Sequence, residues 1–158
     1  MDTNLDSPLI SILLPIYGES VYFEESLYSI LVQSYKNFEL LIIYDGDYSK
    51  MYEKYVLIDN RIIFIDGKKK GISAALNLGV LHAKGEYIAR MDVDDMSSVD
   101  RIEEQLKYLI KNDLDICGSN LKLFPDSLHI RKRGLTSWPR SDRPDEDDHL
   151  RPDHGGGP

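Results

Sequence analysis

The 158-residue chain has a single cysteine, Cys117, so it can form no internal disulfide. Basic residues are also scarce: 19 Lys and Arg stand against 27 Asp and Glu, and the formal net charge of −8 argues against a nucleic-acid-binding protein. The first residues lack the basic start of a secretory signal, and the longest apolar runs are only strand-length. We therefore expect a cytoplasmic chain with no transmembrane segment, whose only membrane association would be peripheral, at the inner face.

Several common nucleotide and catalytic motifs are missing as well. No G-x-x-x-x-G-K-[ST] sequence occurs, which excludes a P-loop NTPase. The stretch from Lys70 to Gly79 has two glycines but not the G-x-G-x-x-G spacing, and it follows the third expected strand rather than the first. No Ser-His-Asp or Cys-His arrangement is recognisable.

What the sequence does contain is an alternation of short apolar runs and helical patterns. Expected strands are Leu9–Pro15, Phe38–Tyr44, Ile62–Ile65, Tyr87–Met91 and Asp115–Ser119. Strand–helix alternation of this kind predicts the α/β class, with a mainly parallel sheet flanked by helices.

Two apolar stripes predict helices between these strands. Leu27, Ile30 and Leu31 mark the first, and Ile102, Leu106, Leu109 and Ile110 mark the second. Ser97 or Ser98 is expected to cap the second helix, with Asp100 in its first turn.

The character of the chain changes near Pro125. Residues 126–158 are rich in proline, glycine and histidine and hold only scattered large apolar residues. Such a segment buries too little apolar surface to offset the entropy lost on ordering. We expect one domain over residues 1–125 and a low-complexity, disordered tail over residues 126–158.

Polar groups follow three of the expected strands, where ligands bind in parallel α/β sheets. Tyr17 offers a ring for base stacking, Asp45 can accept a hydrogen bond from an imide N–H, and Asp94 offers an oxygen ligand for Mg²⁺ or Mn²⁺. Other readings stay open for each: a packed loop aromatic, an ordinary Asp-Gly turn, and one of four Asp-x-Asp triplets in an acidic sequence.

The order of these motifs resembles glycosyltransferase family 2, which has the GT-A fold. The resemblance covers residues 8–124. It is carried by Ile10–Tyr17, Ser29–Leu40, Tyr44–Asp47, Gly71–Asn77, Ala83–Asp95 and Asp100–Gln105. It implies transfer of a sugar from a nucleotide-diphosphate donor, most often a UDP-sugar, to an acceptor hydroxyl.

The resemblance also implies roles for individual residues. Pro15, Tyr17 and Glu19 would line the pocket for the base, and Asp45 would hold the base edge. Asp92 would approach the ribose or the diphosphate.

A divalent cation, Mg²⁺ or Mn²⁺, is implied by the same resemblance. Asp94, in the Asp-x-Asp motif, would ligate the cation that bridges the phosphates. There the cation would neutralise charge on the departing diphosphate.

The sequence departs from the family pattern in two ways. Tyr44, Asp47 and Gly18 replace residues that are usual around the base site. No segment resembles the acceptor-binding half, so the resemblance predicts a truncated chain that lacks the general base. The acceptor would be a glycan or a lipid-linked glycan, in surface polysaccharide synthesis.

Two other functions remain open at this level. A non-catalytic nucleotide-binding α/β module would share every motif of the donor-binding half. A receiver-like signalling domain would need a lysine after a late strand, and Cys117-Gly118-Ser119 supplies none.

Overall fold

The structure is a computed structural model that describes residues 7–46, 54–55, 57–68, 70–121 and 136–139. The chain divides into two compact units, Met1–Glu103 and Glu104–Pro158. The division lies earlier than the expected domain end at residue 125, which stays a prediction.

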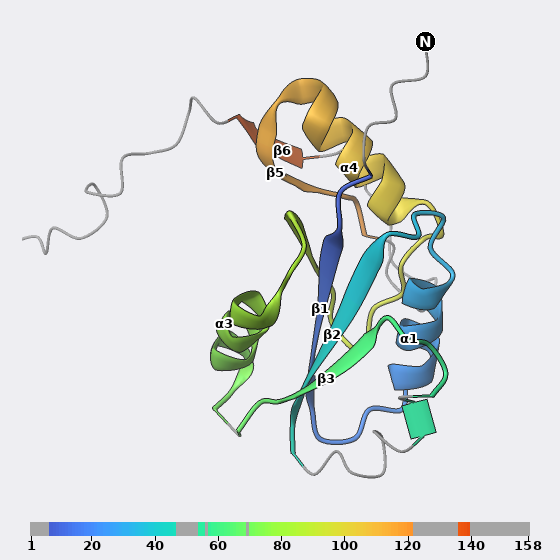
Figure 1. The fold of residues 1–158 in the computed structure, drawn as a ribbon, viewed down its shortest axis with the longest axis vertical. Helices are drawn as coiled ribbons and strands as arrows, with labels where there is room; N and C mark the ends of the chain where they lie inside the picture. Colours follow the sequence, from blue (N-terminus) through green and yellow to red (C-terminus); the bar gives the residue numbers. More distant parts are fainter. Residues whose placement is uncertain (1–6, 47–53, 56, 69, 122–135, 140–158) are drawn as a thin grey trace, which may run out of the picture. The chain divides into compact units, whose positions relative to one another are not determined.

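A four-stranded parallel sheet forms the centre of the first unit (Figure 1). Its strands are β1 (Ile10–Tyr17), β2 (Phe38–Asp45), β3 (Ile62–Asp66) and β4 (Tyr87–Arg90), in the order β3-β2-β1-β4. Most residues of β2 are apolar and all eight are buried, as expected for a strand covered on both faces. The predicted α/β class with a mainly parallel sheet is confirmed.

Two helices of the first unit cover the sheet, α1 (Phe23–Leu31) and α3 (Ile72–His82). Helix α1 connects β1 to β2, and α3 connects β3 to β4. These two connections run in opposite directions across the sheet, so right-handed crossovers place the two helices on opposite faces. Figure 1 shows this arrangement. The α3 side is tightly packed, because a Cβ built on Gly79 would lie 2.9 Å from Ile43 Cδ1.

β1 extends two residues beyond its expected end at Pro15, so both Pro15 and Tyr17 lie within the strand. Proline is unusual in a central strand because it has no N–H to donate. The pairing explains it. β4 pairs only with Ile10–Leu13 of β1, and the Leu13 carbonyl accepts the Met91 N–H (3.1 Å) at the end of that ladder. Successive residues of a strand direct their backbone groups to alternate sides, so the nitrogen of Pro15, two residues after Leu13, also lies on the β4 side. It lies beyond the last hydrogen bond between β1 and β4.

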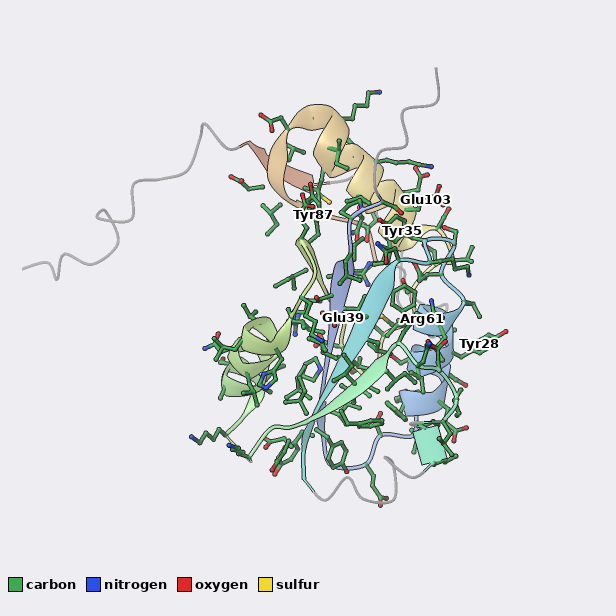
Figure 2. The ribbon with its side chains drawn as sticks, viewed as in Figure 1. Tyr28, Tyr35, Glu39, Arg61, Tyr87 and Glu103 are labelled. Atoms are coloured by element: carbon green, nitrogen blue, oxygen red, sulfur yellow. The ribbon has the colours of Figure 1, made fainter. Side chains whose placement is uncertain are left out.

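A buried polar network joins β1 and β2 to the turn before β4. The Ser11 hydroxyl and the Lys84 N–H each donate to Glu39 Oε1, both at 2.6 Å. The Gly85 N–H donates to Ser11 Oγ (2.8 Å), and a Cβ on Gly85 would lie 2.5 Å from the Ser11 nitrogen. Glu39 is labelled in Figure 2. These contacts fix where β4 begins.

The second unit contains most of α4 (Arg101–Asn112) and a two-stranded antiparallel sheet of β5 (Leu114–Gly118) and β6 (Thr136–Pro139). The expected strand Asp115–Ser119 exists as β5, which pairs antiparallel with β6 rather than within the four-stranded sheet. β6 lies in the expected tail, and the rest of residues 126–158 falls outside the described residues.

The second predicted helix is confirmed as α4. It begins at Arg101, whose N–H donates to the Ser98 carbonyl (3.1 Å), so the helix starts later than a serine cap would place it. Ile102 and Leu106 are buried, whereas Ile110 is exposed. No helix in the described parts of the chain is long and apolar enough to cross a bilayer.

The Glu39 network yields a stability prediction. Glu39→Leu should lower the free energy of unfolding by about 2–4 kcal/mol, because it leaves the buried Ser11 hydroxyl and Lys84 N–H without an acceptor. Glu39→Gln keeps an oxygen at this place and should lose less. Urea unfolding followed by circular dichroism measures the difference. Glu86→Leu changes an exposed carboxylate beside the same turn and serves as control. A Glu39→Leu variant as stable as this control would show that the network contributes nothing.

Candidate functional site

A pocket of about 300 Å³ opens at the carboxyl edge of the sheet in the first unit. The end of β1, the end of β2 and the first turn of α3 form its walls. Most of its surface is apolar, with one carboxylate. Its lining residues are Pro15, Ile16, Tyr17, Asp45, Gly71, Ile72 and Ala75.

Asp45 is the last residue of β2, and it is only 5% exposed. Its Oδ2 accepts a hydrogen bond from the Gly71 N–H at 3.1 Å. Its Oδ1 is buried and has no hydrogen-bond partner within the described ranges. A buried carboxylate oxygen left in this state is costly, so the site is ready for a donor from a ligand.

The turn between β3 and α3 brings the opposite wall of the pocket to Asp45. The Gly67 N–H donates to the Tyr44 carbonyl (2.8 Å), and a Cβ on Gly67 would come within 3.1 Å of that oxygen. Gly71 then precedes α3 with a φ of 82°, a left-handed value that favours glycine. Both glycines allow the close approach of this turn to the end of β2.

The structure brings together three of the residues singled out from the sequence. Pro15, Tyr17 and Asp45 line the same pocket. The Tyr17 side chain is 81% exposed, so its ring is available as a wall for a planar ligand. Glu19 is exposed and is not among the residues that line the pocket.

Asp92 and Asp94 lie in the loop that follows β4, which we call the acidic loop (residues 91–100). They do not line the pocket. The Asp92 carboxylate is engaged, because its Oδ1 accepts a hydrogen bond from Arg90 Nη2 at 2.6 Å. Asp94 is exposed.

Pocket and acidic loop share the edge of the sheet where a ligand is expected. Both lie at the carboxyl ends of parallel strands. The strand order also reverses at β1, which has β2 on one side and β4 on the other. Ligands of open α/β sheets bind at such a switch point.

The described residues contain no group of three His, Cys, Asp or Glu side chains that could hold a metal ion. Asp94 is an exposed carboxylate, next to the exposed Asp95 and close to Asp92, which is already paired with Arg90. Mg²⁺ and Mn²⁺ accept such a sparse protein shell when waters and phosphate oxygens complete it. The residues fit a cation that arrives with a diphosphate.

Part of the site was not predicted from the sequence. Gly71, Ile72 and Ala75 lie in the segment Gly71–Asn77 that carries the resemblance, but no binding role was predicted for them, although they form one wall of the pocket. The detectable signal was Gly71, a glycine just before a helical pattern and after a strand. Arg90 was also missed, and only the contact with Asp92 reveals it.

Comparison with known proteins gives the family. The model of the family described as "Glycosyl transferase family 2" matches residues 11–157. This match extends beyond residue 124, where the resemblance in motifs ends. An uncharacterized glycosyltransferase of Haemophilus influenzae is 34% identical over 80% of this chain and 56% of its own length. The O-antigen biosynthesis glycosyltransferase WbnJ of Escherichia coli is 35% identical over 75% of this chain and 48% of its own length. The chain thus spans about half of these two relatives.

Solved structures show the same fold. S. aureus TarS, residues 1–349, superposes with a TM-score of 0.64 at 17% identity, over 78% of this chain and 38% of that one. The mannosyltransferase PcManGT of Pyrobaculum calidifontis gives a TM-score of 0.62 at 21% identity, over 73% and 36%. The family match covers nearly the whole sequence and agrees with this fold, so the chain belongs to glycosyltransferase family 2.

Proposed function

We propose that the first unit binds a nucleotide-diphosphate sugar, with the base in the pocket at Asp45, and that it serves transfer of the sugar to an acceptor hydroxyl. The observation that carries this proposal is the buried Asp45 Oδ1, which lacks a partner among the described residues of an otherwise apolar pocket. Such a combination suits a flat ring that has one N–H to donate.

The base that fits this chemistry best is uracil. Its N3–H donates to a carboxylate oxygen, whereas cytosine presents an acceptor at the same ring position. Asp45 Oδ2 is already occupied by the Gly71 N–H, so Oδ1 is the oxygen that is left for the base. We assign Tyr17 and Pro15 to the walls around the ring and propose a UDP-sugar as donor. S. aureus TarS has been solved with UDP-GlcNAc, in support of this choice.

The diphosphate would extend from the pocket toward the switch point between β1 and β4. There Asp92 would approach the ribose or the diphosphate, and Asp94 would be a ligand of Mg²⁺ or Mn²⁺. A cation bound there supplies charge neutralisation for the departing diphosphate. The PcManGT structure contains GDP-Man and Mn²⁺, which supports a divalent cation in a protein of this fold. Glu19 is exposed near the end of β1 and is proposed only as a rim residue of the base site.

The acceptor is proposed from the relatives. WbnJ is named for O-antigen biosynthesis, and we propose a glycan or lipid-linked glycan acceptor in surface polysaccharide synthesis. The reaction would take place in the cytoplasm or at the inner face of the membrane. We assign no residue to deprotonation of the acceptor hydroxyl.

The Asp45 assignment predicts a change of base preference. In Asp45→Asn, the amide oxygen can keep the Gly71 contact and the NH₂ group then faces the base. UDP should bind roughly 10- to 100-fold more weakly, the usual effect of losing a hydrogen bond to a charged group. CDP, with an acceptor at N3, should lose much less. Isothermal titration calorimetry with UDP, CDP and GDP measures the preference.

Asp66→Asn is the matched control, because Asp66 ends the neighbouring strand β3 and is exposed. It should bind UDP as the unchanged protein does. An Asp45→Asn variant that keeps normal UDP affinity would remove Asp45 from base recognition. Tight GDP binding with no UDP binding would overturn the choice of uracil.

The Asp94 assignment predicts a coupling between nucleotide and cation. Mn²⁺ should strengthen UDP binding roughly tenfold in the unchanged protein, a usual size for two ligands that share contacts. Asp94→Ala should bind UDP equally with and without Mn²⁺. Asp95→Ala removes the adjacent exposed carboxylate and should keep the coupling. If Asp95→Ala loses the coupling while Asp94→Ala keeps it, the cation role belongs to Asp95.

A further inference from the structure

Gln33 is a buried polar side chain that takes no part in the pocket, although it lies in the segment Ser29–Leu40 that carries the family resemblance. It stands two residues after the end of α1 and is only 1% exposed. Its Nε2 donates to the Ser98 carbonyl (2.6 Å) and the Ser29 carbonyl (2.9 Å), and it also lies 3.2 Å from Ser97 Oγ. Its Oε1 accepts the Ile102 N–H at 3.1 Å. One amide thus contacts the end of the acidic loop and the first turn of α4.

Two serines of α1 extend this contact along the acidic loop. Ser29 Oγ accepts the Ser97 N–H at 3.0 Å and donates to the Ser26 carbonyl at 2.7 Å. Ser26 Oγ donates to the Asp92 carbonyl at 3.4 Å. Both serines are buried. One face of α1 therefore presents polar groups that bind the backbone of the loop at both ends.

The acidic loop has little else to define its shape. It contains no regular secondary structure, and of its ten residues only Met91 is buried. Met91 is fixed through its N–H, which donates to the Leu13 carbonyl. Beyond it, three backbone hydrogen bonds involve the loop among the described residues: Asp95 N–H to the Asp92 carbonyl (3.2 Å), Ser34 N–H to the Val99 carbonyl (2.7 Å) and Arg101 N–H to the Ser98 carbonyl (3.1 Å). The side chains of Ser26, Ser29 and Gln33 add further restraint on residues 92–98.

We propose that Gln33 is a positioning residue for the acidic loop, and that it holds the backbone at Ser98 and Ile102 so that Asp92 and Asp94 face the diphosphate of the donor. This rests on the proposed function for the role of Asp94. Gln33 itself touches no ligand. It acts through the backbone, since a buried amide that satisfies both a carbonyl and an N–H fixes their separation and orientation.

The chain offers a substitution that removes this function with little change in volume. Methionine in Gln33→Met has a similar length but neither donates nor accepts, so the Ile102 N–H loses its partner and the Ser98 carbonyl loses the Gln33 amide while it keeps the Arg101 N–H. Ser34→Ala is the matched control. Ser34 is the next residue, and its Oγ donates to Glu103 Oε2 at 2.7 Å on an exposed surface without touching residues 92–98.

Two measurements on the full 158-residue chain test the proposal. The first is hydrogen–deuterium exchange of peptides that cover residues 92–100, compared with peptides from β1 and β2. In Gln33→Met, exchange over 92–100 should be roughly tenfold faster, as expected when the hydrogen bonds of a buried amide to the loop and to α4 are lost. The strands should exchange as in the unchanged protein, and Ser34→Ala should exchange normally everywhere.

The second measurement is calorimetry of UDP with and without Mn²⁺. Gln33→Met should bind UDP normally without metal, because the pocket at Asp45 is intact, and should lose most of the gain that Mn²⁺ provides. A residue that only stabilised the fold would weaken both. Unchanged exchange over 92–100, or equally faster exchange in the loop and in β1 and β2, would overturn the proposal.

The two proposals fail separately. If the unchanged protein binds no UDP, the proposed function fails, and loop exchange alone still decides whether Gln33 positions residues 92–100. If Gln33→Met does not fold, Ser29→Ala is the second variant, since it leaves Gln33 in place and removes the contacts of Ser29 Oγ with the Ser97 N–H and the Ser26 carbonyl. It should speed exchange of the peptide that contains Ser97 and leave the strands unchanged. Normal exchange in that peptide would count against positioning by the α1 polar face.

Discussion

Strand β1 is the constraint on which the first unit depends, because it pairs in parallel with β2 on one side and β4 on the other. Parallel pairing brings the carboxyl ends of these strands to one edge, so Tyr17, Asp45 and the start of the acidic loop share that edge. The crossover from β3 to β4 must pass over the sheet, and this places α3 against β1 and β2. The pocket is what remains between the strand ends and the first turn of that helix.

The two halves of the proposed donor site are built in different ways. The pocket rests on backbone that is fixed by ladders and by a helix start, with Asp45 held by the Gly71 N–H. The acidic loop has no ladder and is held by Ser29 of α1 and by Gln33, which follows the helix. Rigid elements place a group more precisely than loops do. The buried serines of α1 bind the backbone of the acidic loop and so restrain a segment that has no regular secondary structure.

Much of this arrangement follows from local patterns in the sequence. Apolar runs mark β1 to β4, and the Asp after the second run is found in the pocket, as strand ends predict. A short apolar run does not indicate which strand it pairs with, so the antiparallel pairing of β5 with β6 could not be predicted from the run itself. Gly71, Ile72 and Ala75 were missed because their position depends on the turn at Gly67, a contact between segments more than twenty residues apart. The role of Gln33 could not be predicted for the same reason, because its partners Ser98 and Ile102 lie about seventy residues along the chain.

Pro15 has a consequence for association between chains. Past Leu13, no strand of the described residues pairs with β1 on the β4 side, so β1 has a short unpaired edge next to the pocket. Unpaired strand edges can pair with a strand from another molecule, which leads to aggregation. Proline at this place offers no N–H to an incoming strand, and Pro15 and Ile16 are buried. The missing N–H and the burial together keep this part of β1 from acting as a template for intermolecular β-pairing.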